Sequence, residues 1–359
     1  MATVVLAGGG TAGHVEPALA VAREWRDTFP KDRIIFLGTV GGLENILVPA
    51  AGFELVHIPK VRITRKPSLS WLRIPLDFFA AISRLGSILK DVDLLIGFGG
   101  YVSGPAYVSA RISGIPTVIH EANAKPGWAN RLGALMTSYL AVAGEVDSRE
   151  FTDALITGLP LRADVAKAYE SSFTDFARAR SAAKERLGFN SDSPLIFIMG
   201  GSQGSQAINA AVEKAIPVLV EKGFSILHSV GMGNVLPSAQ SGYKPVGYVD
   251  AMADAYLASD LVIARSGAVT CSEFRTLGRY ALFIPLPIGN GEQRHNARAL
   301  VENLRAEIVE QSNFNAEYLI THIDGLLSHA AAAPNGGSDS DLQAAQKIVA
   351  LGEFAMSKR

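Results

Sequence analysis

Short apolar runs alternate with helix-like stretches along the first half of the chain. The apolar runs occupy positions 3–8, 33–38, 94–100, 116–121 and 139–144, and a helical periodicity covers positions 15–29. These runs hold too few polar positions for a sheet with one solvated face. They predict interior strands of a parallel sheet that is covered on both faces. Strand, helix and strand in repeated order predict a doubly wound α/β domain.

The same pattern starts again in the second half. Residues 194–212 predict a strand, a glycine-rich turn and a helix, and apolar runs follow at 224–231, 245–249, 261–267 and 280–287. The fold class is therefore α/β, with two Rossmann-like domains that we place at residues 1–161 and 162–341. A last helix, 342–359, could pack on either half, and we assign it to the first domain. Two such domains form a cleft between the carboxyl ends of their sheets, where ligands bind.

Composition narrows the class of protein. The chain has 359 residues with a net charge of −1, so nothing in the overall charge favours nucleic acid as a partner. A single cysteine, Cys271, excludes an internal disulfide and fits a reducing compartment. The start of the chain has no basic segment typical of a signal peptide, and no apolar run is long enough to span a bilayer. We expect a cytoplasmic protein, which can still lie on a membrane surface.

The turn after the first strand has glycines at positions 8, 10 and 13, the spacing of the dinucleotide-binding fingerprint. That fingerprint also requires an acidic residue at the end of the next strand, where it binds the ribose. Here the strand ends in Gly-Thr at positions 38–39, Glu44 comes too late, and Asp32 precedes the strand. The incomplete fingerprint disfavours an NAD site.

Two further glycine loops, at 97–105 and 199–206, also follow predicted strands. Glycines at such positions can serve only close packing of strand and helix, or they can let backbone N–H groups approach an anion at a helix start. Three loops facing one cleft favour phosphate binding. None is followed by Gly-Lys-Ser/Thr, so the loops are not those of a nucleoside-triphosphate hydrolase.

Polar residues of the second half suit a nucleotide sugar. Glu273 lies about two turns into a predicted helix after the strand at 261–267, where a carboxylate could accept both hydroxyls of a ribose. The alternative is a solvated helix residue. Gln293 and Asn296 belong to a loop rich in amides and cations, and amides offer donors and an acceptor to sugar hydroxyls.

Six blocks of sequence, in this order, resemble the MurG family of N-acetylglucosaminyltransferases. They are "GGGTAGHVEPALAVA", "GFGGYVSGPA", "HEANAKPGWANR", "TGLPLR", "GGSQGSQAINAA" and "RSGAVTCSE…EQRHNA", and they run from the first strand to about position 299. The resemblance implies the GT-B fold, with the donor UDP-N-acetylglucosamine mainly in the C-terminal domain. It also implies lipid I, an undecaprenyl-diphosphate-linked muramyl pentapeptide, as the acceptor.

The resemblance also implies roles for single residues. Glu273 would hold the ribose, and Ser202 and Gln203 would lie at the donor phosphates. The remaining contacts to the donor would come from Thr11, Ala12, Gly13, Asn123, Arg162 and Gln293. The acceptor diphosphate would be cradled by Gly10, Gly100, Tyr101 and Ser103.

Members of the family invert the anomeric centre, which requires a base for the acceptor C4 hydroxyl and stabilisation of departing UDP. His14 titrates near neutrality and belongs to the loop facing the cleft, so it is the candidate base, with a loop-shaping role as the alternative. Glu121 is the reserve base. The helix dipole after the third loop and Arg162 could neutralise the diphosphate, and no metal-ligand spacing occurs in the sequence, so we expect neither a metal nor another cofactor.

The chain departs from the family pattern in three places. Ala12 stands where glycine is commoner, which could alter the first loop, since alanine reaches positive φ at greater cost. Leu159 stands where asparagine is commoner. The polar, alanine-rich stretch 163–186 is longer than usual and has no assigned role.

Residues 60–90 form a basic and amphipathic segment. It carries seven cations against Asp77 alone, a net charge of +6, and aromatic and aliphatic residues such as Trp71, Phe78 and Phe79 are interleaved with them. Such a segment can lie on an anionic membrane surface, and the alternative is a helix packed on the core. We expect a peripheral protein at the cytoplasmic side of the cell membrane, with other cell-wall and division proteins as candidate partners.

Three hypotheses for the function follow from the sequence. The first is an inverting N-acetylglucosaminyltransferase that acts on lipid I and gives lipid II. The second is another GT-B transferase or a UDP-sugar epimerase of similar architecture. The third is a non-catalytic protein that binds a UDP-sugar.

Overall fold

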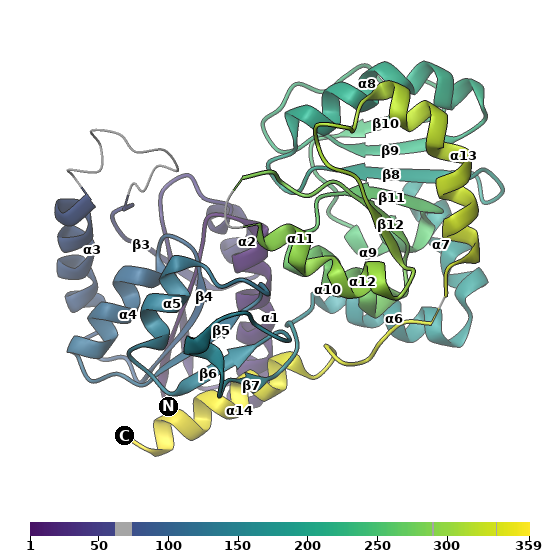
Figure 1. Cartoon of the computed structure of the whole chain (residues 1–359). Coiled ribbons are helices and arrows are strands. Elements are labelled where there is room, and N and C mark those ends of the chain that lie inside the picture. Colours follow the sequence, from purple (N-terminus) through teal and green to yellow (C-terminus); the bar gives the residue numbers. More distant parts are fainter. Residues whose placement is uncertain (62–73, 289–290, 335) are drawn as a thin grey trace. The chain divides into compact units, whose positions relative to one another are not determined.

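The computed structural model describes residues 1–61, 74–288, 291–334 and 336–359. The chain divides into two compact units, drawn in Figure 1. Unit 1 comprises Met1–Arg162 and Ser340–Arg359, and unit 2 comprises Ala163–Asp339. Arg162, Ser340 and Asp341, assigned to the second domain from the sequence, lie in unit 1, where Arg162 pairs with Glu16 and Asp341 accepts the N–H of Leu159.

Unit 1 is built on a parallel sheet in the order β3-β2-β1-β4-β5-β6-β7. Its strands are β1 (Thr3–Gly8), β2 (Arg33–Gly38), β3 (Glu54–His57), β4 (Leu94–Gly99), β5 (Thr117–Glu121), β6 (Tyr139–Val142) and β7 (Leu155–Ile156). Its α-helices are α1 (Ala12–Thr28), α2 (Glu44–Ala50), α3 (Ile74–Ile88), α4 (Ser103–Ile112), α5 (Trp128–Ala134) and α14 (Ala344–Ser357), and a 3-10 turn covers Arg149–Phe151. The sequence pattern missed the short edge strands β3 and β7.

Unit 2 repeats the design with the order β10-β9-β8-β11-β12-β13. Its strands are β8 (Leu195–Met199), β9 (Ser225–Ser229), β10 (Tyr243–Val246), β11 (Leu261–Ala264), β12 (Ala281–Phe283) and β13 (Ala306–Ile308). Its helices are α6 (Ala163–Thr174), α7 (Phe176–Leu187), α8 (Gln206–Glu221), α9 (Met252–Ala258), α10 (Ala268–Leu277), α11 (Glu292–Asn296), α12 (Arg298–Glu302) and α13 (Ala316–Ala332). All strand pairs in both sheets are parallel, as the uniformly apolar runs predicted.

Each sheet has a topological switch point beside its first strand. In unit 1, β1 pairs with β2 on one side and with β4 on the other, and in unit 2, β8 lies between β9 and β11. The connections that leave two such neighbouring strands run in opposite directions and open a crevice at the carboxyl ends, where open α/β sheets bind their ligands. The three glycine loops follow β1, β4 and β8, so all three lie at a switch point.

The C-terminal helix α14 packs on the sheet of unit 1 beside α1 (Figure 1). Ile348, Val349 and Ala355 belong to the same buried cluster as Trp25 and Leu94. Gly352 permits this close approach, because a Cβ there would lie 2.8 Å from both the Leu94 and the Trp25 side chains. The apolar residues of α14 thus complete one face of the first sheet.

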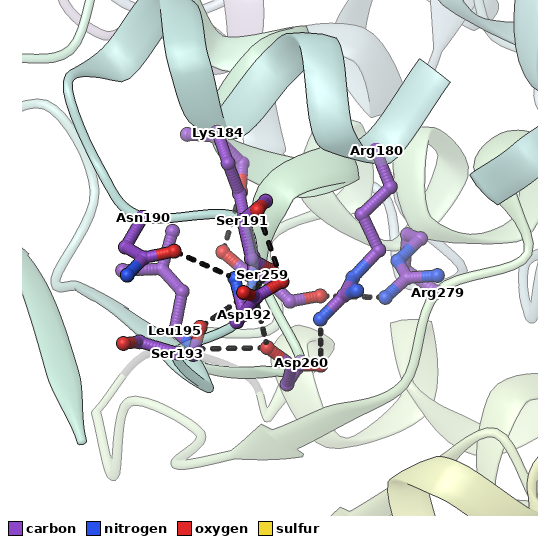
Figure 2. Close-up of polar contacts among 11 residues, drawn as sticks. Arg180, Lys184, Asn190, Ser191, Asp192, Ser193, Leu195, Ser259, Asp260 and Arg279 are labelled. Atoms are coloured by element: carbon purple, nitrogen blue, oxygen red, sulfur yellow. Dashed lines mark hydrogen bonds and ion pairs between the residues drawn. The ribbon is translucent and has the colours of Figure 1, made fainter. Parts of the chain in front are cut away.

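A cluster of ion pairs at the amino-terminal edge of the sheet in unit 2 joins the buried Lys184 to partly buried Arg180 and Asp260 (Figure 2). Asp260, just before β11, pairs with Arg180 and Lys184 of α7 and accepts the N–H of Leu195 at 2.8 Å. Arg279 donates to the carbonyl of Ser259, and burial lowers its pKa to about 10. Residues 163–186, which had no assigned role, thus form α6 and α7, and α7 supplies cations that fix the starts of β8 and β11.

One detail of the first unit differs from the sequence expectations. The first helix begins at Ala12 rather than at position 15, so Ala12 has helical backbone geometry and needs no positive φ. The expected cost of a positive φ therefore does not arise at Ala12. Within the described ranges, no helix combines the length and the apolar character that crossing a bilayer requires.

Candidate functional site

The turn between β1 and α1 brings His14 to the carboxyl end of the first sheet. Gly10 has a φ of 93°, in the left-handed region that favours glycine, and α1 begins two residues later. The His14 ring lies partly buried, with Nδ1 3.2 Å from Thr11 Oγ1 and a hydrogen bond to the backbone of Gly9. Burial lowers the pKa of His14 below its usual value, and the bond to Gly9 and the charge of Glu44 act in the opposite direction. The lowered pKa favours the neutral ring, which can accept a proton.

The loop after β4 lies against the loop after β1. Gly99 and Gly100 have φ of 90° and 87°, and a Cβ on Gly100 would lie 2.5 Å from the carbonyl oxygen of Gly9. A Cβ on Gly99 would lie 3.3 Å from the ring of His14. Glycine at these positions therefore lets the two loops touch and leaves room for the imidazole.

Side chains of the second loop take different positions. Tyr101 packs over the first loop, and a Cβ placed on Gly10 would lie 3.7 Å from the Tyr101 ring. The ammonium of Lys60 lies 5.5 Å from the centre of that ring. Ser103 is fully buried, with its hydroxyl 2.8 Å and 2.7 Å from the carbonyl oxygens of Ala7 and Gly99. The Ser103 hydroxyl therefore cannot make the expected contact with a diphosphate. It joins the loop to β1 inside the protein instead.

Glu121, at the end of β5, organises the loop that follows it. Its carboxylate is 2% exposed and accepts four hydrogen bonds, from the N–H and the side-chain amide of Asn123, the N–H of Gly127 and the side-chain amide of Asn130. Burial raises the pKa of Glu121, and these hydrogen bonds oppose the rise. The hydroxyl of Tyr107 donates to Asn130 Oδ1 at 2.7 Å and extends the network into the core. Asn123 is thus held at the same end of the sheet as His14.

Arg162 lies in unit 1 and faces the first helix. Its guanidinium is 3.8 Å from the carboxylate of Glu16, and both side chains are largely buried. Glu16 is one turn beyond Thr11 on α1, so Arg162 is fixed near the first glycine loop. No sequence signal paired these two residues, since they are distant along the chain.

The third glycine loop follows β8 in unit 2 and packs on the turn after β9. Gly204 has a φ of 73°, and a Cβ there would lie 2.0 Å from the carbonyl oxygen of Val230. The carbonyls of Ser202 and Gln203 accept hydrogen bonds from Met232 N–H and from the Asn234 side chain. The loop is therefore held through its backbone, with Ser202 half-buried and Gln203 exposed.

Arg265 ties the loops at the switch point of unit 2 together. Its guanidinium donates to Ser205 Oγ at 2.8 Å, to Gln311 Oε1, and to the carbonyls of Ile284 and Pro285. Burial lowers the pKa of this arginine. Ser205 also caps α8 by accepting the N–H of Ile208. Arg265 lies in one of the sequence blocks above, but we assigned it no role from the sequence. Its position directly after β11 is the signal that could have identified it as a site residue.

Glu273 is buried rather than solvated. It lies in α10 with 1% of its surface exposed, and Tyr256 of α9 donates its hydroxyl to Oε2 at 2.8 Å. The solvated-helix alternative for Glu273 is therefore wrong. Tyr256 was not identified from the sequence, because an aromatic residue in an apolar helix gives no sign of a polar contact.

Gln293 and Asn296 lie in the short helix α11. Gln293 Oε1 accepts the N–H of Leu286 at 3.0 Å and so fixes the loop after β12, while Asn296 Nδ2 lies 3.4 Å from the carbonyl of Ser266. The amide-rich segment is thus tied to the loops after β11 and β12, at the carboxyl edge of the second sheet.

The sequence-predicted residues fall into two groups. Unit 1 gathers Gly10, Thr11, Ala12, Gly13, His14, Gly100, Tyr101, Glu121, Asn123 and Arg162 at the carboxyl end of its sheet. Unit 2 gathers Ser202, Gln203, Glu273 and Gln293 around its own switch point. The group in unit 1 is rich in glycine, the group in unit 2 is polar, and the charged side chains of both are held by hydrogen bonds or ion pairs. Each can bind an anionic or hydroxyl-bearing ligand.

The basic segment 60–90 is described in part. Residues 62–73, which include Arg65, Lys66 and Trp71, lie outside the described residues. Within α3, Ala81 and Leu85 are buried in unit 1, whereas Leu76 and Phe79 are 71% and 75% exposed. The helix therefore combines a core-packing side with exposed apolar residues.

Comparison with known proteins identifies the family. The glycosyltransferase family 28 N-terminal domain matches residues 4–144, and the C-terminal domain of the same family matches residues 195–351. A curated relative from Corynebacterium glutamicum is 44% identical over 91% of this chain and 89% of its own length. Another, from Frankia casuarinae, is 40% identical over 99% of this chain and 96% of its own length. Both are named UDP-N-acetylglucosamine--N-acetylmuramyl-(pentapeptide) pyrophosphoryl-undecaprenol N-acetylglucosamine transferase.

Solved structures agree. The crystal structure of Acinetobacter baumannii MurG superposes with a TM-score of 0.69 at 26% identity, covering 99% of this chain and all of that one. A UDP-GlcNAc 2-epimerase from Neisseria meningitidis, with a TM-score of 0.60, 16% identity and all of both chains covered, shares the fold alone. The predicted α/β class, with two Rossmann-like domains of the GT-B type, is confirmed. From its glycine loops to its C-terminal domain, this chain belongs to glycosyltransferase family 28 and, within it, to the MurG family.

Proposed function

We propose that this chain transfers N-acetylglucosamine from UDP-N-acetylglucosamine to the C4 hydroxyl of the N-acetylmuramyl residue of lipid I, giving lipid II for peptidoglycan synthesis. The observation that carries this function is the match to transferases of that name, at 44% and 40% identity over 91% and 99% of this chain. Two separate polar groups, one at each switch point, suit an enzyme that brings two substrates together.

The donor is assigned to unit 2. Glu273, held by Tyr256, would accept the ribose hydroxyls, since an ionised carboxylate offers several acceptor sites. Backbone N–H groups of the loop with Ser202 and Gln203, at the start of α8, would meet the diphosphate together with the helix dipole. Gln293 has its carbonyl engaged by Leu286, so its amide NH2 is the end that would meet the sugar.

The acceptor is assigned to unit 1. The loops after β1 and β4 touch through glycines, and the N-terminus of α1 adds positive potential for a lipid-linked diphosphate. Tyr101 and Asn123 would border the sugars, and Arg162, near the first loop, would add a cation for the departing UDP when both substrates are bound.

The transfer is a single displacement. The oxygen of the acceptor C4 hydroxyl attacks C1 of N-acetylglucosamine, the hydroxyl proton passes to His14, and the bond from C1 to the UDP oxygen breaks, which inverts the configuration at C1. Burial lowers the pKa of His14, so the unprotonated ring needed for this step predominates at neutral pH. Glu121 accepts four hydrogen bonds, which suits it to positioning Asn123 better than to proton transfer.

Incubation of the purified chain with labelled UDP-N-acetylglucosamine and a lipid I analogue tests the function. We expect label in a lipid II product. Release of free N-acetylmannosamine or its UDP form without transfer would instead indicate an epimerase, and binding of UDP-N-acetylglucosamine without turnover would indicate a non-catalytic protein.

The same assay tests the base. His14→Gln should lower kcat by about 100-fold or more, the usual effect of removing a general base. In the unaltered chain, activity should fall as the pH drops through the pKa of His14, because the base is then protonated, and His14→Gln should lose that limb. Full activity of His14→Gln would leave the family assignment intact and remove His14 as the base.

Lipid I places the reaction at a membrane. We infer that the chain is a peripheral protein on the cytoplasmic face, with residues 60–90 against anionic lipid. Exposed Leu76 and Phe79 on α3 support this, since apolar side chains beside cations favour an interfacial position.

A further inference from the structure

Glu44 is a buried carboxylate that has no role in the proposed reaction. It is the first residue of α2, and none of its side-chain surface reaches solvent. Its oxygens accept the N–H of Gly10 at 2.8 Å and the N–H of Thr39 at 2.9 Å. Among the described residues no Lys, Arg or His forms an ion pair with it. Buried carboxylates are costly unless hydrogen bonds or dipoles compensate, and here two backbone amides and the N-terminus of α2 do so.

Three glycines make the space for this carboxylate. A Cβ on Gly42 would lie 2.2 Å from Glu44 Oε2, one on Gly38 would lie 2.7 Å from Cγ, and one on Gly9 would lie 3.1 Å from Oε1. None of the three has a positive φ, so backbone freedom does not explain them. Gly9 lies in the loop after β1, Gly38 is the last residue of β2 and Gly42 lies in the loop after β2, so glycines from two separate parts of the sheet edge surround one side chain.

This placement changes which N–H groups of the first glycine loop can bind the acceptor diphosphate. The Gly10 N–H, expected to bind the acceptor diphosphate, already donates to Glu44. Among the described residues no acceptor is found for the N–H groups of Thr11, Ala12 and Gly13, which precede or open the first turn of α1. An anion at this loop would meet those three groups rather than Gly10.

We propose that Glu44 is the positioning residue of the acceptor side. Its carboxylate accepts the N–H of Gly10 and so joins the loop after β1 to the loop after β2. This contact fixes the positions of the N–H groups that open the first turn of α1 and of the His14 ring. This inference rests on the proposed function, because it assigns the acceptor diphosphate to that loop.

The charge of Glu44 also acts on His14. The loop after β4 brings only uncharged glycine backbone to the ring among the described residues, because Gly99 and Gly100 are its residues nearest His14. Glu44 is the charged group among the described residues that raises the pKa of His14 against the effect of burial. Removal of this charge should therefore lower the pKa of His14 further.

Glu44→Gln tests the proposal, with Glu54→Gln as the matched control. Glu54 is an exposed carboxylate of the same unit that pairs with Arg33. The pKa of His14 is followed by NMR titration of its ring proton, identified by its loss in His14→Gln, and steady-state KM is measured for each substrate. We expect Glu44→Gln to lower the pKa of His14, to move the acidic limb of the rate profile to lower pH, and to raise KM for lipid I by about tenfold or more, the effect of losing a charged hydrogen bond. KM for UDP-N-acetylglucosamine should not change.

Gly42→Ala covers the case in which Glu44→Gln fails to fold. Its methyl group displaces the carboxylate without removing the charge, and Gly86→Ala in α3, where nothing lies within 4 Å, is its control. We expect Gly42→Ala to raise KM for lipid I while Gly86→Ala does not. An unchanged pKa of His14 and unchanged KM for lipid I in the Glu44 and Gly42 variants would overturn the proposal. The NMR titration needs no turnover, so a chain inactive in transfer would count against the proposed function alone.

Discussion

At the scale of single residues, the functional side chains are held by hydrogen bonds that the sequence does not reveal. His14 depends on Thr11 and Gly9, Glu121 on Asn123 and Asn130, and Glu273 on Tyr256. His14 could be named from the sequence because it follows a glycine turn, whereas the roles of Glu121, Asn123 and Arg162 were implied by the resemblance to the family. The hydrogen bonds themselves could not, because Asn130 and Tyr256 lie on other elements than the carboxylates they meet, and the spacing of Thr11 and Asn123 does not reveal a hydrogen bond.

Tyr256→Phe tests the assignment of Glu273 to the ribose. Loss of the hydroxyl leaves the carboxylate with one donor fewer and free to turn, so KM for UDP-N-acetylglucosamine should rise about tenfold, as for other hydrogen bonds to charged groups. The preference for the ribose donor over its 2′-deoxy analogue should shrink, and KM for lipid I should stay the same. Tyr169→Phe, in α6 of the same unit, serves as the control. A ribose preference equal to that of the unaltered chain would argue against this role.

At the scale of elements, α7 and α3 show what periodicity alone leaves open. Residues 163–186 are polar and alanine-rich, which predicts a helix but not its purpose. The structure pairs Arg180 and Lys184 of this stretch with Asp260, and Arg279 lies beside them (Figure 2). The contact joins segments far apart in the chain, so no local pattern contains it.

Asp260→Asn should destabilise unit 2. The change leaves Arg180, the buried Lys184 and Arg279 near one another without their carboxylate, and breaking a buried pair in this way costs about 3 kcal/mol. Urea unfolding of the variant should show an earlier transition for unit 2. Asp324→Asn removes an exposed partner of Lys222 and should change stability by about 0.5 kcal/mol or less. Equal stabilities of the two variants would contradict a structural role for the cluster.

For α3, replacement of both Leu76 and Phe79 by Asp should weaken binding to vesicles that contain anionic lipid. Two exposed apolar side chains are lost and two negative charges are added next to the basic segment. Sedimentation with vesicles of mixed neutral and anionic lipid measures the effect. Ile112→Asp, an equally exposed apolar position at the end of α4, is the control and should bind as before. Undiminished binding of the α3 variant would place the membrane contact elsewhere.

At the scale of the whole molecule, the chain returns to its first unit after completing the second. Helix α14 supplies Ile348, Val349 and Ala355 to the core around Trp25. Each unit thus has its own core and its own switch point, and the last residues belong to the stability of the first.

Gly352→Val tests this division. The added carbons would overlap Leu94 and Trp25, and overpacking of this kind costs about 1–3 kcal/mol. Calorimetry should show a lower transition for unit 1 and an unchanged one for unit 2, with binding of UDP-N-acetylglucosamine preserved. Gly325→Val, at a helical position in α13 with nothing within 4 Å, should be neutral. A loss confined to unit 2 would be incompatible with this arrangement.

The sequence by itself determined the α/β class, the repeat of the design and the glycine loops. Strand periodicity, glycine spacing and motif order are local properties that can be read along the chain. Only the tertiary structure decided that Glu44 lies beneath the first loop, that Ser103 faces inward, that Ala12 is helical and that Arg162 meets Glu16. The physical reason is that these facts depend on the packing of strands distant in sequence. The sequence alone does not tell whether a carboxylate faces solvent or accepts hydrogen bonds from two backbone amides.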